Sequence, residues 1–505
     1  MKSTKVRVVL TALFIGVFME NLDHTIMATA IPSVVAEIGG MDVFSWVFSV
    51  YLLTSTIFIP VFGKLSDQYG KKPFLLIGFM TFVVASALSA NAESMWQLIT
   101  YRAIQGLGAA PLMPIAFSMI FELVKPEKQG KMQALFALIN GLSLILGPLV
   151  GAYLTDNLSW HWVFWINVPL GAIAAVLIAL FYKEQKLRKK VSIDYAGATS
   201  LTLAIAPLMI GLVTGGKEFP WTSWQTITLF SLSVLFTYIF IQIEKKAKEP
   251  IIALHLFNKK VVSSSAVGLI QGFVMIAVMV YIPFFIQGVL GGSATHVGKI
   301  VVHMIIAMIV GTGIGGHLLA KISPRALMFS SILLMTLGSL LLIQIDAQTT
   351  DMFFFIAMIL IGLGMGPLFP VTTLLAQTSV NHEHTTSVTS IVSFFRNIGM
   401  ALGSSLLAVI VNSQVSKSVL KIVEIEDLNK EQVELLKDPN LLVDPTIQAL
   451  VPHQVFQTLQ NALSEGIVQV FIATIGMIIL MFVFSFLAGK ERLVPSHHGK
   501  KIGFH

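Results

Sequence analysis

Four charged side chains lie within long apolar stretches of this 505-residue sequence, namely Glu20, Asp23, Arg102 and Arg396. A charge placed in hydrocarbon is costly, so each of these residues is a candidate functional group. Counting 1.5 Å per residue from the ends of their stretches, Asp23 lies roughly 13 Å in from Pro32 and Arg102 roughly 9 Å in from Trp96. The two depths are similar, so an ion pair between Asp23 and Arg102 is geometrically allowed.

Two interpretations of such a pair remain open. A permanent bridge would neutralise two buried charges and do nothing else. Alternatively, protonation of Asp23 would free Arg102 and shift the surrounding helices, which is the chemistry of proton coupling. Both residues are therefore candidate proton-coupling groups.

Glu20 lies three residues before Asp23, so both project from nearly the same helix face. Without an obvious partner, Glu20 would suit a proton carrier and would also attract a cationic substrate. The alternative is a protonated Glu20 that donates one hydrogen bond inside a packed bundle. His24, His303 and Arg396 complete the candidates for a substrate cavity, although a lone His in a helix also fits a hydrogen-bonded filler.

The elements that must position these residues are predicted to be transmembrane helices. Hydrophobic residues make up 55% of the chain and charged residues only 12%, which is typical of a membrane protein. A helix needs roughly 20 apolar residues to cross the hydrocarbon layer. Fourteen such runs are predicted, near 8–31, 44–62, 74–92, 96–120, 131–154, 161–182, 194–214, 225–243, 262–288, 297–319, 326–344, 353–377, 387–413 and 466–488.

The distribution of Lys and Arg predicts the orientation of these helices. Basic residues of short loops stay in the cytoplasm, and here they gather on one side, which places both termini there. The net charge of +7 therefore reflects topology, and no basic soluble module is present to bind nucleic acid. The chain has no Cys and its His residues are scattered, so we expect no metal and no cofactor.

One outer loop, at about 414–465, is predicted to be long, with a helix-like stretch near 455–462. It is either a solvated cap or a lid that faces the substrate.

An internal repeat indicates how the helices are grouped. The stretch 106–114 (GLGAAPLMP) recurs as 362–370 (GLGMGPLFP), with six of nine positions identical and an offset of 256 residues. This duplication predicts two six-helix halves, residues 1–190 and 246–505, separated by an inserted helix pair at 191–245. Two such halves enclosing a cavity are the plan of an alternating-access transporter.

The turn 63–72 (GKLSDQYGKK) resembles the signature of the major facilitator superfamily. Gly63 and Gly70 allow a tight reversal, and Asp67 can face a helix N-terminus across the seam between halves. The resemblance implies that Gly63, Asp67, Gly70 and Lys71 latch a cytoplasmic gate, whereas the alternative is a solvated basic turn. The matching turn near 321–325 has no acid, which predicts a one-sided latch.

Further stretches resemble the fourteen-helix drug:proton antiporters of that superfamily. They are 22–25 with 31–32, Arg102 with 105–106, 147–151, 249–257 and 395–399. The resemblance implies a major facilitator fold, a place in the cell membrane and exchange of protons for lipophilic, cationic drugs. It also identifies Gly147, Pro148 and Gly151 as the antiporter motif, where the Gly-Pro pair would let the helix bend.

The second half departs from that pattern, because its predicted helices contain no buried acid, and this favours neutral or monovalent substrates. An exporter of a physiological lipid, peptide or metabolite is the alternative function. An enzyme is disfavoured, since neither a nucleophile with a base nor a nucleotide-binding loop is present. The expected partners are protons, a lipophilic small molecule and membrane lipid, with the chain acting as a monomer.

Overall fold

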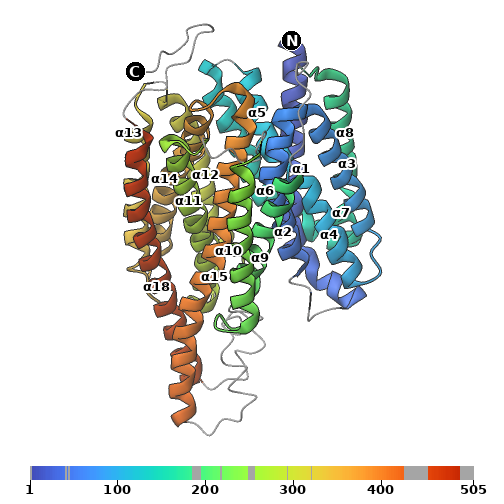
Figure 1. Cartoon of the computed structure of the whole chain (residues 1–505). Coiled ribbons are helices and arrows are strands. Elements are labelled where there is room, and N and C mark those ends of the chain that lie inside the picture. The colour runs from blue at the N-terminus through green and yellow to red at the C-terminus, as the bar shows by residue number, and fades with distance from the viewer. Residues whose placement is uncertain are drawn as a thin grey trace.

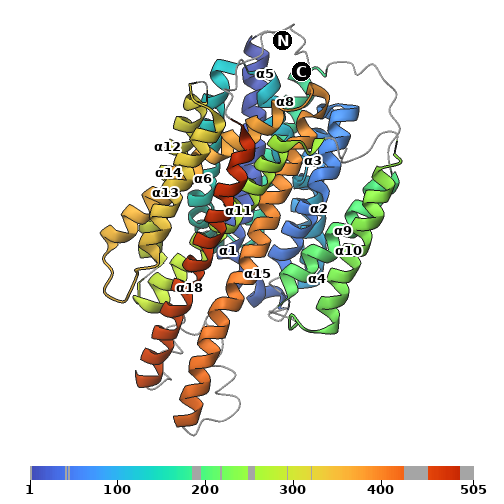
Figure 2. The same cartoon turned by 60° about the vertical axis from the view of Figure 1, so that its left-hand side comes forward.

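The computed structural model is a bundle of long helices whose axes are nearly parallel (Figures 1 and 2). It describes residues 3–39, 43, 46–124, 126–184, 195–215, 219–247, 256–292, 294–319, 321–425 and 453–489. Within these residues no β-strand is assigned. The prediction of an all-helical membrane protein is therefore confirmed.

The helices fall into three groups along the chain. The first bundle comprises α1 (Ser3–Ile38), α2 (Trp46–Tyr69), α3 (Lys71–Ser89), α4 (Met95–Ala109), α5 (Leu112–Leu123), α6 (Pro126–Asn157), α7 (His161–Trp165) and α8 (Asn167–Phe181). Two helices follow, α9 (Tyr195–Thr214) and α10 (Trp224–Glu244). The second bundle comprises α11 (Lys259–Phe284) with η2 (Phe285–Val289), α12 (Ala294–Leu318), α13 (Pro324–Leu342), α14 (Asp351–Gln377), η3 (His382–His384), α15 (Thr385–Ile425), α18 (His453–Ser485) and η5 (Phe486–Ala488).

Local sequence explains where several helices begin. Ser94, Ser223 and Ser323 each accept a hydrogen bond from a backbone N–H in the first turn of α4, α10 and α13. Asn258 does the same for α11, with acceptor distances of 3.0 and 3.1 Å. These caps satisfy N–H groups that have no partner within the helix.

Eleven membrane-spanning candidates are present among the described residues, with α4–α5 and α7–α8 each forming one interrupted span. The three other predicted ranges lie in α1, α6 and α9, which are also helical. Large apolar side chains such as Leu180 (69% exposed) and Val234 (71% exposed) face outward from the bundle. Such a surface suits contact with lipid.

The predicted boundaries are wrong at both ends of the outer loop. Helix α15 continues beyond 413 to Ile425, and α18 begins at His453 rather than at 466. The two extensions project together beyond the rest of the bundle (Figure 2), and Gln414 donates to Glu465 over 2.7 Å between them. Their polar residues can be helical outside the membrane, where an apolar run is not required.

Residues that match in the 256-residue repeat also pack against equivalent helices. Gly106 of α4 lies against the backbone of Tyr51 in α2, and Gly362 of α14 lies against Met304 and Met308 in α12. Two residues on, Gly108 faces α3 and Gly364 faces α13. Each matched glycine thus meets the corresponding neighbour in its own bundle.

Helix α9 packs along the seam where α2 and α15 meet. Leu201, Ile205 and Met209 of α9 share an apolar cluster with Leu53 of α2 and Val392 of α15. The Ser405 hydroxyl of α15 donates to the Leu212 carbonyl. The pair α9–α10 therefore flanks the contact between the two bundles, as Figure 2 shows on its right-hand side.

Candidate functional site

The structure brings Asp23 of α1 and Arg102 of α4 together. Arg102 Nη1 lies 2.5 Å from Asp23 Oδ2, and both side chains are at most 1% exposed. Since α1 and α4 are separated by two helices in the chain, tertiary packing creates this pair. The predicted contact is confirmed, whereas its role in proton coupling stays a prediction.

Polar side chains surround the Asp23 carboxylate on its other sides. Gln105 Nε2 donates to Oδ1 over 2.9 Å, and Asn167 Nδ2 donates to the same oxygen over 2.7 Å. Asn167 also donates to Ser86 Oγ over 3.0 Å, and Ser86 in turn donates to the Phe164 carbonyl over 2.9 Å. The carboxylate is therefore held by helices α4 and α8, and through Asn167 the network reaches α3.

Arg102 makes three further contacts. Its Nη1 also donates to Gln105 Oε1 over 2.9 Å, and its Nε donates to the Val47 carbonyl over 3.3 Å. The guanidinium carbon lies 4.3 Å from the centre of the Tyr51 ring, within the range of a cation–π contact. The ring centre of His24, the residue after Asp23, is 6.1 Å from that of Tyr51. A change in the charge of Asp23 would therefore alter the contacts of Arg102 with α2 as well as those within α4.

Glu20 lies one turn before this network and is half-buried. Its Oε2 is shielded from solvent and has no hydrogen-bond partner among the described residues. The His24 side chain is exposed although it lies near the middle of α1. Both residues remain candidates for a cavity, as predicted.

The other two cavity candidates lie in the second bundle, in different surroundings. Arg396 of α15 contacts Phe369 and Thr372 of α14. His303 stacks on Phe355 with 4.2 Å between ring centres, and its Nδ1 is 2.7 Å from the Lys299 carbonyl of its own helix. In the described part of the chain no hydrogen bond or ion pair joins His303 to Asp23, Glu20 or Arg396. The structure therefore groups Asp23 with Arg102 but not with His303.

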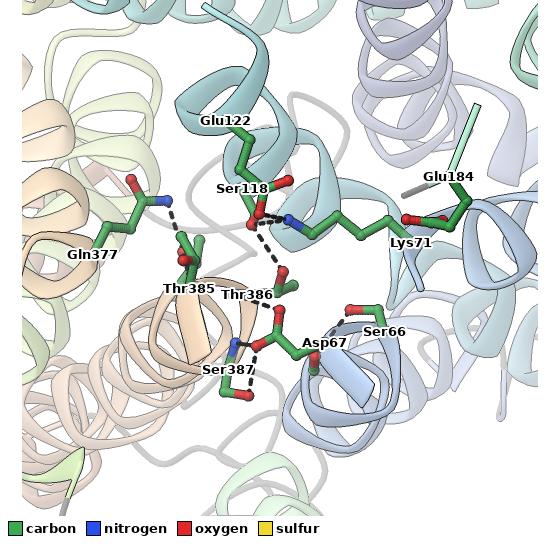
Figure 3. Close-up of polar contacts among 12 residues, drawn as sticks. Ser66, Asp67, Lys71, Ser118, Glu122, Glu184, Gln377, Thr385, Thr386 and Ser387 are labelled. Atoms are coloured by element: carbon green, nitrogen blue, oxygen red, sulfur yellow. Dashed lines mark hydrogen bonds and ion pairs between the residues drawn. The ribbon is translucent and has the colours of Figure 1, made fainter. Parts of the chain in front are cut away.

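A second polar site lies at the end of the bundle where α2 meets α15. Asp67 accepts hydrogen bonds from the backbone N–H groups of Thr386 (3.1 Å) and Ser387 (2.7 Å), and from the Ser387 hydroxyl (2.8 Å). These N–H groups belong to the first turn of α15 and have no partner within the helix. The predicted contact between Asp67 and a helix N-terminus across the seam is confirmed (Figure 3).

Lys71 supports this contact indirectly. Its Nζ donates to Ser118 Oγ over 2.7 Å and forms an ion pair with Glu122, both on α5. Thr386 Oγ1 donates to the same Ser118 oxygen over 2.8 Å. Figure 3 shows Ser118 between Lys71 and Thr386, so α3, α5 and α15 meet at one hydroxyl.

Different constraints require glycine at the two positions of this turn, a close helix contact at Gly63 and a positive φ at Gly70. A Cβ on Gly63 would lie 2.6 Å from the Ser390 Cβ, so glycine allows α2 and α15 to approach closely. Gly70 has a φ of +98°, which side-chain-bearing residues rarely adopt.

Glu184 contacts the same turn. The backbone N–H of Lys72, two residues after Gly70, donates to its carboxylate over 2.7 Å. Burial and the Glu184 carboxylate raise the pKa of Tyr182, whose phenol donates to that carboxylate over 3.4 Å.

The stretch 147–151 lies within α6, which is continuous from Pro126 to Asn157. A Cβ on Gly147 would lie 3.1 Å from the Ile26 amide and would overlap Thr25, so α1 and α6 are in close contact there. Thr25 Oγ1 donates to the Ser143 carbonyl over 3.1 Å. Gly151 is buried as well. A bend at Pro148 stays a prediction.

Sequence reasoning did not single out Asn167, Ser86 and Tyr51 in the first site, or Ser118, Glu122 and Glu184 in the second. Asn167 carries a weak signal, because it is a polar residue between Ile166 and Val168 in an apolar stretch. Ser86 and Ser118 are hydroxyl residues in apolar helices, and such residues commonly bond to their own backbone. Their contacts with other helices depend on tertiary structure.

Comparison with known proteins identifies a family for this fold. The family model described as Major Facilitator Superfamily matches residues 13–404. The chain is 35% identical over 499 residues to "Multidrug resistance protein 3" of Bacillus subtilis (strain 168), covering 97% of both chains. It is 37% identical over 414 residues to "Multidrug transporter protein MdtP" of the same organism, covering 82% of this chain and 76% of the relative.

Two solved structures share the arrangement of helices. A double Trp mutant of XylE matches with a TM-score of 0.61 at 14% identity, covering 98% of each chain. The human organic anion transporter MFSD10 matches with a TM-score of 0.59 at 15% identity, covering 94% of this chain and 99% of the other. At these identities the two structures inform on the fold alone.

Proposed function

The chain belongs to the major facilitator superfamily, and from this premise we propose that it is a drug exporter of the cell membrane that exchanges protons for lipophilic, cationic compounds by alternating access. It is a multi-pass transporter of small molecules and not an enzyme. Its matched relatives include multidrug transporters from Bacillus subtilis and the fungal "Efflux pump dotC" of Dothistroma septosporum. Those names support export of drugs, while the coupling ion and the substrate charge belong to our proposal.

The proposed arrangement in the membrane has fourteen spans grouped as six, two and six. The halves are residues 1–190 and 246–505, with 191–245 inserted between them and both termini in the cytoplasm. The matched glycines of α4 and α14 support the two halves, because equivalent residues pack against equivalent helices. The bias of Lys and Arg supports the orientation, and we propose a monomer in direct contact with membrane lipid.

The observation that carries proton coupling is the buried Asp23–Arg102 pair with its ring of hydrogen bonds. A buried pair of opposite charges is stable only while both are charged and hydrogen-bonded. When a proton binds Asp23, Arg102 becomes an uncompensated cation, and its contacts with Val47 and Tyr51 of α2 must readjust. Protonation thus alters the packing of α1, α2 and α4 together, and Glu20 is a second candidate carrier beside them.

The Asp67 site is the proposed cytoplasmic gate. Its three hydrogen bonds join α2 of the first bundle to α15 of the second, so this end of the seam is closed in the structure. Opening toward the cytoplasm must break these bonds and expose N–H groups of α15. A movement of α2 that follows protonation of Asp23 would reach the gate directly, because Val47, Tyr51 and Asp67 all belong to α2.

The test is Asp23→Asn in proteoliposomes, with export of a lipophilic cationic dye driven by an imposed pH gradient. We expect gradient-driven flux to fall at least about tenfold, because an amide of the same shape cannot carry the proton. Dye exchange without a gradient should persist, which shows that the protein is folded. Asp346→Asn is the matched control, because Asp346 is an exposed carboxylate that bonds only to nearby Gln348 and Thr349 among the described residues. Undiminished gradient-driven flux in Asp23→Asn would refute the coupling role.

A further inference from the structure

Arg396 is a half-buried cation of α15 that the proposed coupling and gating leave unused. Its Nη2 donates weakly to Thr372 Oγ1 over 3.4 Å, and its guanidinium carbon lies 4.5 Å from the centre of the Phe369 ring. Its Nε is shielded from solvent and has no hydrogen-bond partner among the described residues. Four ion pairs occur in the described part of the chain, and none of them includes Arg396.

The depth of Arg396 makes this lack of a partner costly. Thr386 marks the closed end of α15, and ten residues at 1.5 Å each place Arg396 roughly 15 Å from it, near the middle of a hydrocarbon layer of about 30 Å. Arginine at such depth is normally paired or directed into a polar cavity. A stack on one ring and one long hydrogen bond leave most of its five donors available.

Two other arginines have more partners than Arg396 among the described residues. Arg102 has a carboxylate, an amide, a carbonyl and a ring around it. Arg325 lies between the rings of Phe329 and Phe486, at 5.5 and 4.2 Å, in the first turn of α13 where its charge is near the membrane surface. Arg396 has neither an acidic partner, as Arg102 has, nor two stacked rings near the membrane surface, as Arg325 has, among the described residues.

The neighbouring residue places Arg396 at the seam between the bundles. Asn397 Nδ2 donates to Thr56 Oγ1 of α2 over 3.2 Å, so this turn of α15 faces the first bundle. A transporter of this family encloses its substrate between the two bundles at the membrane midplane. In the first bundle, α1 carries Glu20, a carboxylate whose Oε2 also lacks a partner among the described residues.

We propose that Arg396 binds a carboxylate of the substrate, so that the exported compounds include zwitterions with an aromatic or otherwise apolar body. The guanidinium would hold the carboxylate through charge-assisted hydrogen bonds, Phe369 would contact the apolar body, and Glu20 would attract the cationic group. This inference rests on the proposed drug export and adds an anionic subsite in the second bundle to it.

A pair of dyes with one scaffold tests the subsite. Rhodamine B has a cationic ring system and a free carboxylate, and its ethyl ester has the same ring system without that charge. In proteoliposomes with a pH gradient, wild type should export both, and Arg396→Gln should lower rhodamine B flux about tenfold, the effect of losing a charge-assisted hydrogen bond. Flux of the ester should change less than about twofold, because it never used that bond.

Two further variants separate binding from folding. Arg396→Lys keeps the charge but not the planar fork, so it should retain ester export and recover only part of the rhodamine B flux. Arg325→Gln, which removes an arginine stacked on rings outside the seam, should leave the ratio of the two fluxes unchanged. Equal losses of both dyes in Arg396→Gln and Arg396→Lys, or no loss of either, would overturn the subsite. Failure of wild type to export the ester would contradict drug export itself.

Discussion

Helices α4 and α14 share a glycine–proline frame, that is, the same spacing of glycine and proline in residues 106–114 and 362–370. They differ in their polar residues. Gly106 and Gly108 match Gly362 and Gly364, and each pair makes equivalent contacts. At the same offset, Arg102 of α4 corresponds to Met358 of α14, and Gln105 corresponds to Ile361. All four side chains are fully buried. Packing is therefore common to both bundles, whereas the charge that could respond to protons lies in only one.

The turns that follow α2 and α12 differ in the same way. Asp67 in the first turn reaches across the seam to α15. The second turn has no acid, and its Arg325 stacks on rings of its own bundle. In our proposal the gate is therefore one-sided, and the first bundle provides both the proton site and the latch.

Replacing Arg102 by the residue of the matched position should have the largest effect. Arg102→Met leaves the buried Asp23 without a counter-charge, so the free energy of unfolding should fall by about 3–5 kcal/mol. The midpoint of thermal unfolding in detergent measures this loss.

The double variant Asp23→Met with Arg102→Met gives α4 an apolar contact like that of α14. The double variant should recover most of the lost stability, because both charges are removed together. It should show no gradient-driven export. A single variant as stable as wild type, or a double variant less stable than the single one, would contradict the comparison.

The shared frame predicts equal effects of the same change in both bundles. Gly106→Ala and Gly362→Ala should each lower the free energy of unfolding by about 1–3 kcal/mol, because a Cβ would press on the neighbouring backbone. Thermal unfolding again provides the measurement. Gly476→Ala in α18 is the matched control, since nothing lies within 4 Å of a Cβ there and no loss is expected. A large loss in one bundle only would show that the frame is not equivalent.

The smallest effect is expected at the gate. Asp67→Asn weakens a cap worth about 1 kcal/mol and should raise the population open to the cytoplasm about fivefold. The chain has no Cys, so Ser390→Cys can report on opening, because Ser390 is buried against Gly63. Its labelling by a membrane-impermeant thiol reagent from the cytoplasmic side should speed up by the same factor.

Glu383→Gln in the same Ser390→Cys background is the control for the gate. Glu383 is an exposed carboxylate near the start of α15, so its removal should alter labelling little. Equal labelling rates in the Asp67→Asn and Glu383→Gln variants would exclude Asp67 as a latch.

Much of the candidate site could be predicted because depth in a membrane helix follows from residue counting. Similar depths allowed Asp23 to meet Arg102, and the position of Asp67 at the end of α2 allowed it to reach a helix N-terminus. Counting gives no rotation about the helix axis. His303, at a plausible depth on α12, stacks on Phe355 instead of meeting the other candidates. The ends of α15 and α18 were missed because helix outside the membrane needs no apolar run.

The sequence by itself determined that the chain forms apolar helices with few charges within them, since this follows from the need for apolar residues and internal backbone hydrogen bonds in lipid. Only the tertiary structure decided which partners each charge has. Asn167 is 144 residues from Asp23, and Ser387 is 320 residues from Asp67. Among the described residues, the same packing gave Arg396 no acidic partner. Side-chain contacts between helices depend on how the helices are turned and placed, and that is fixed by the packing of the whole bundle.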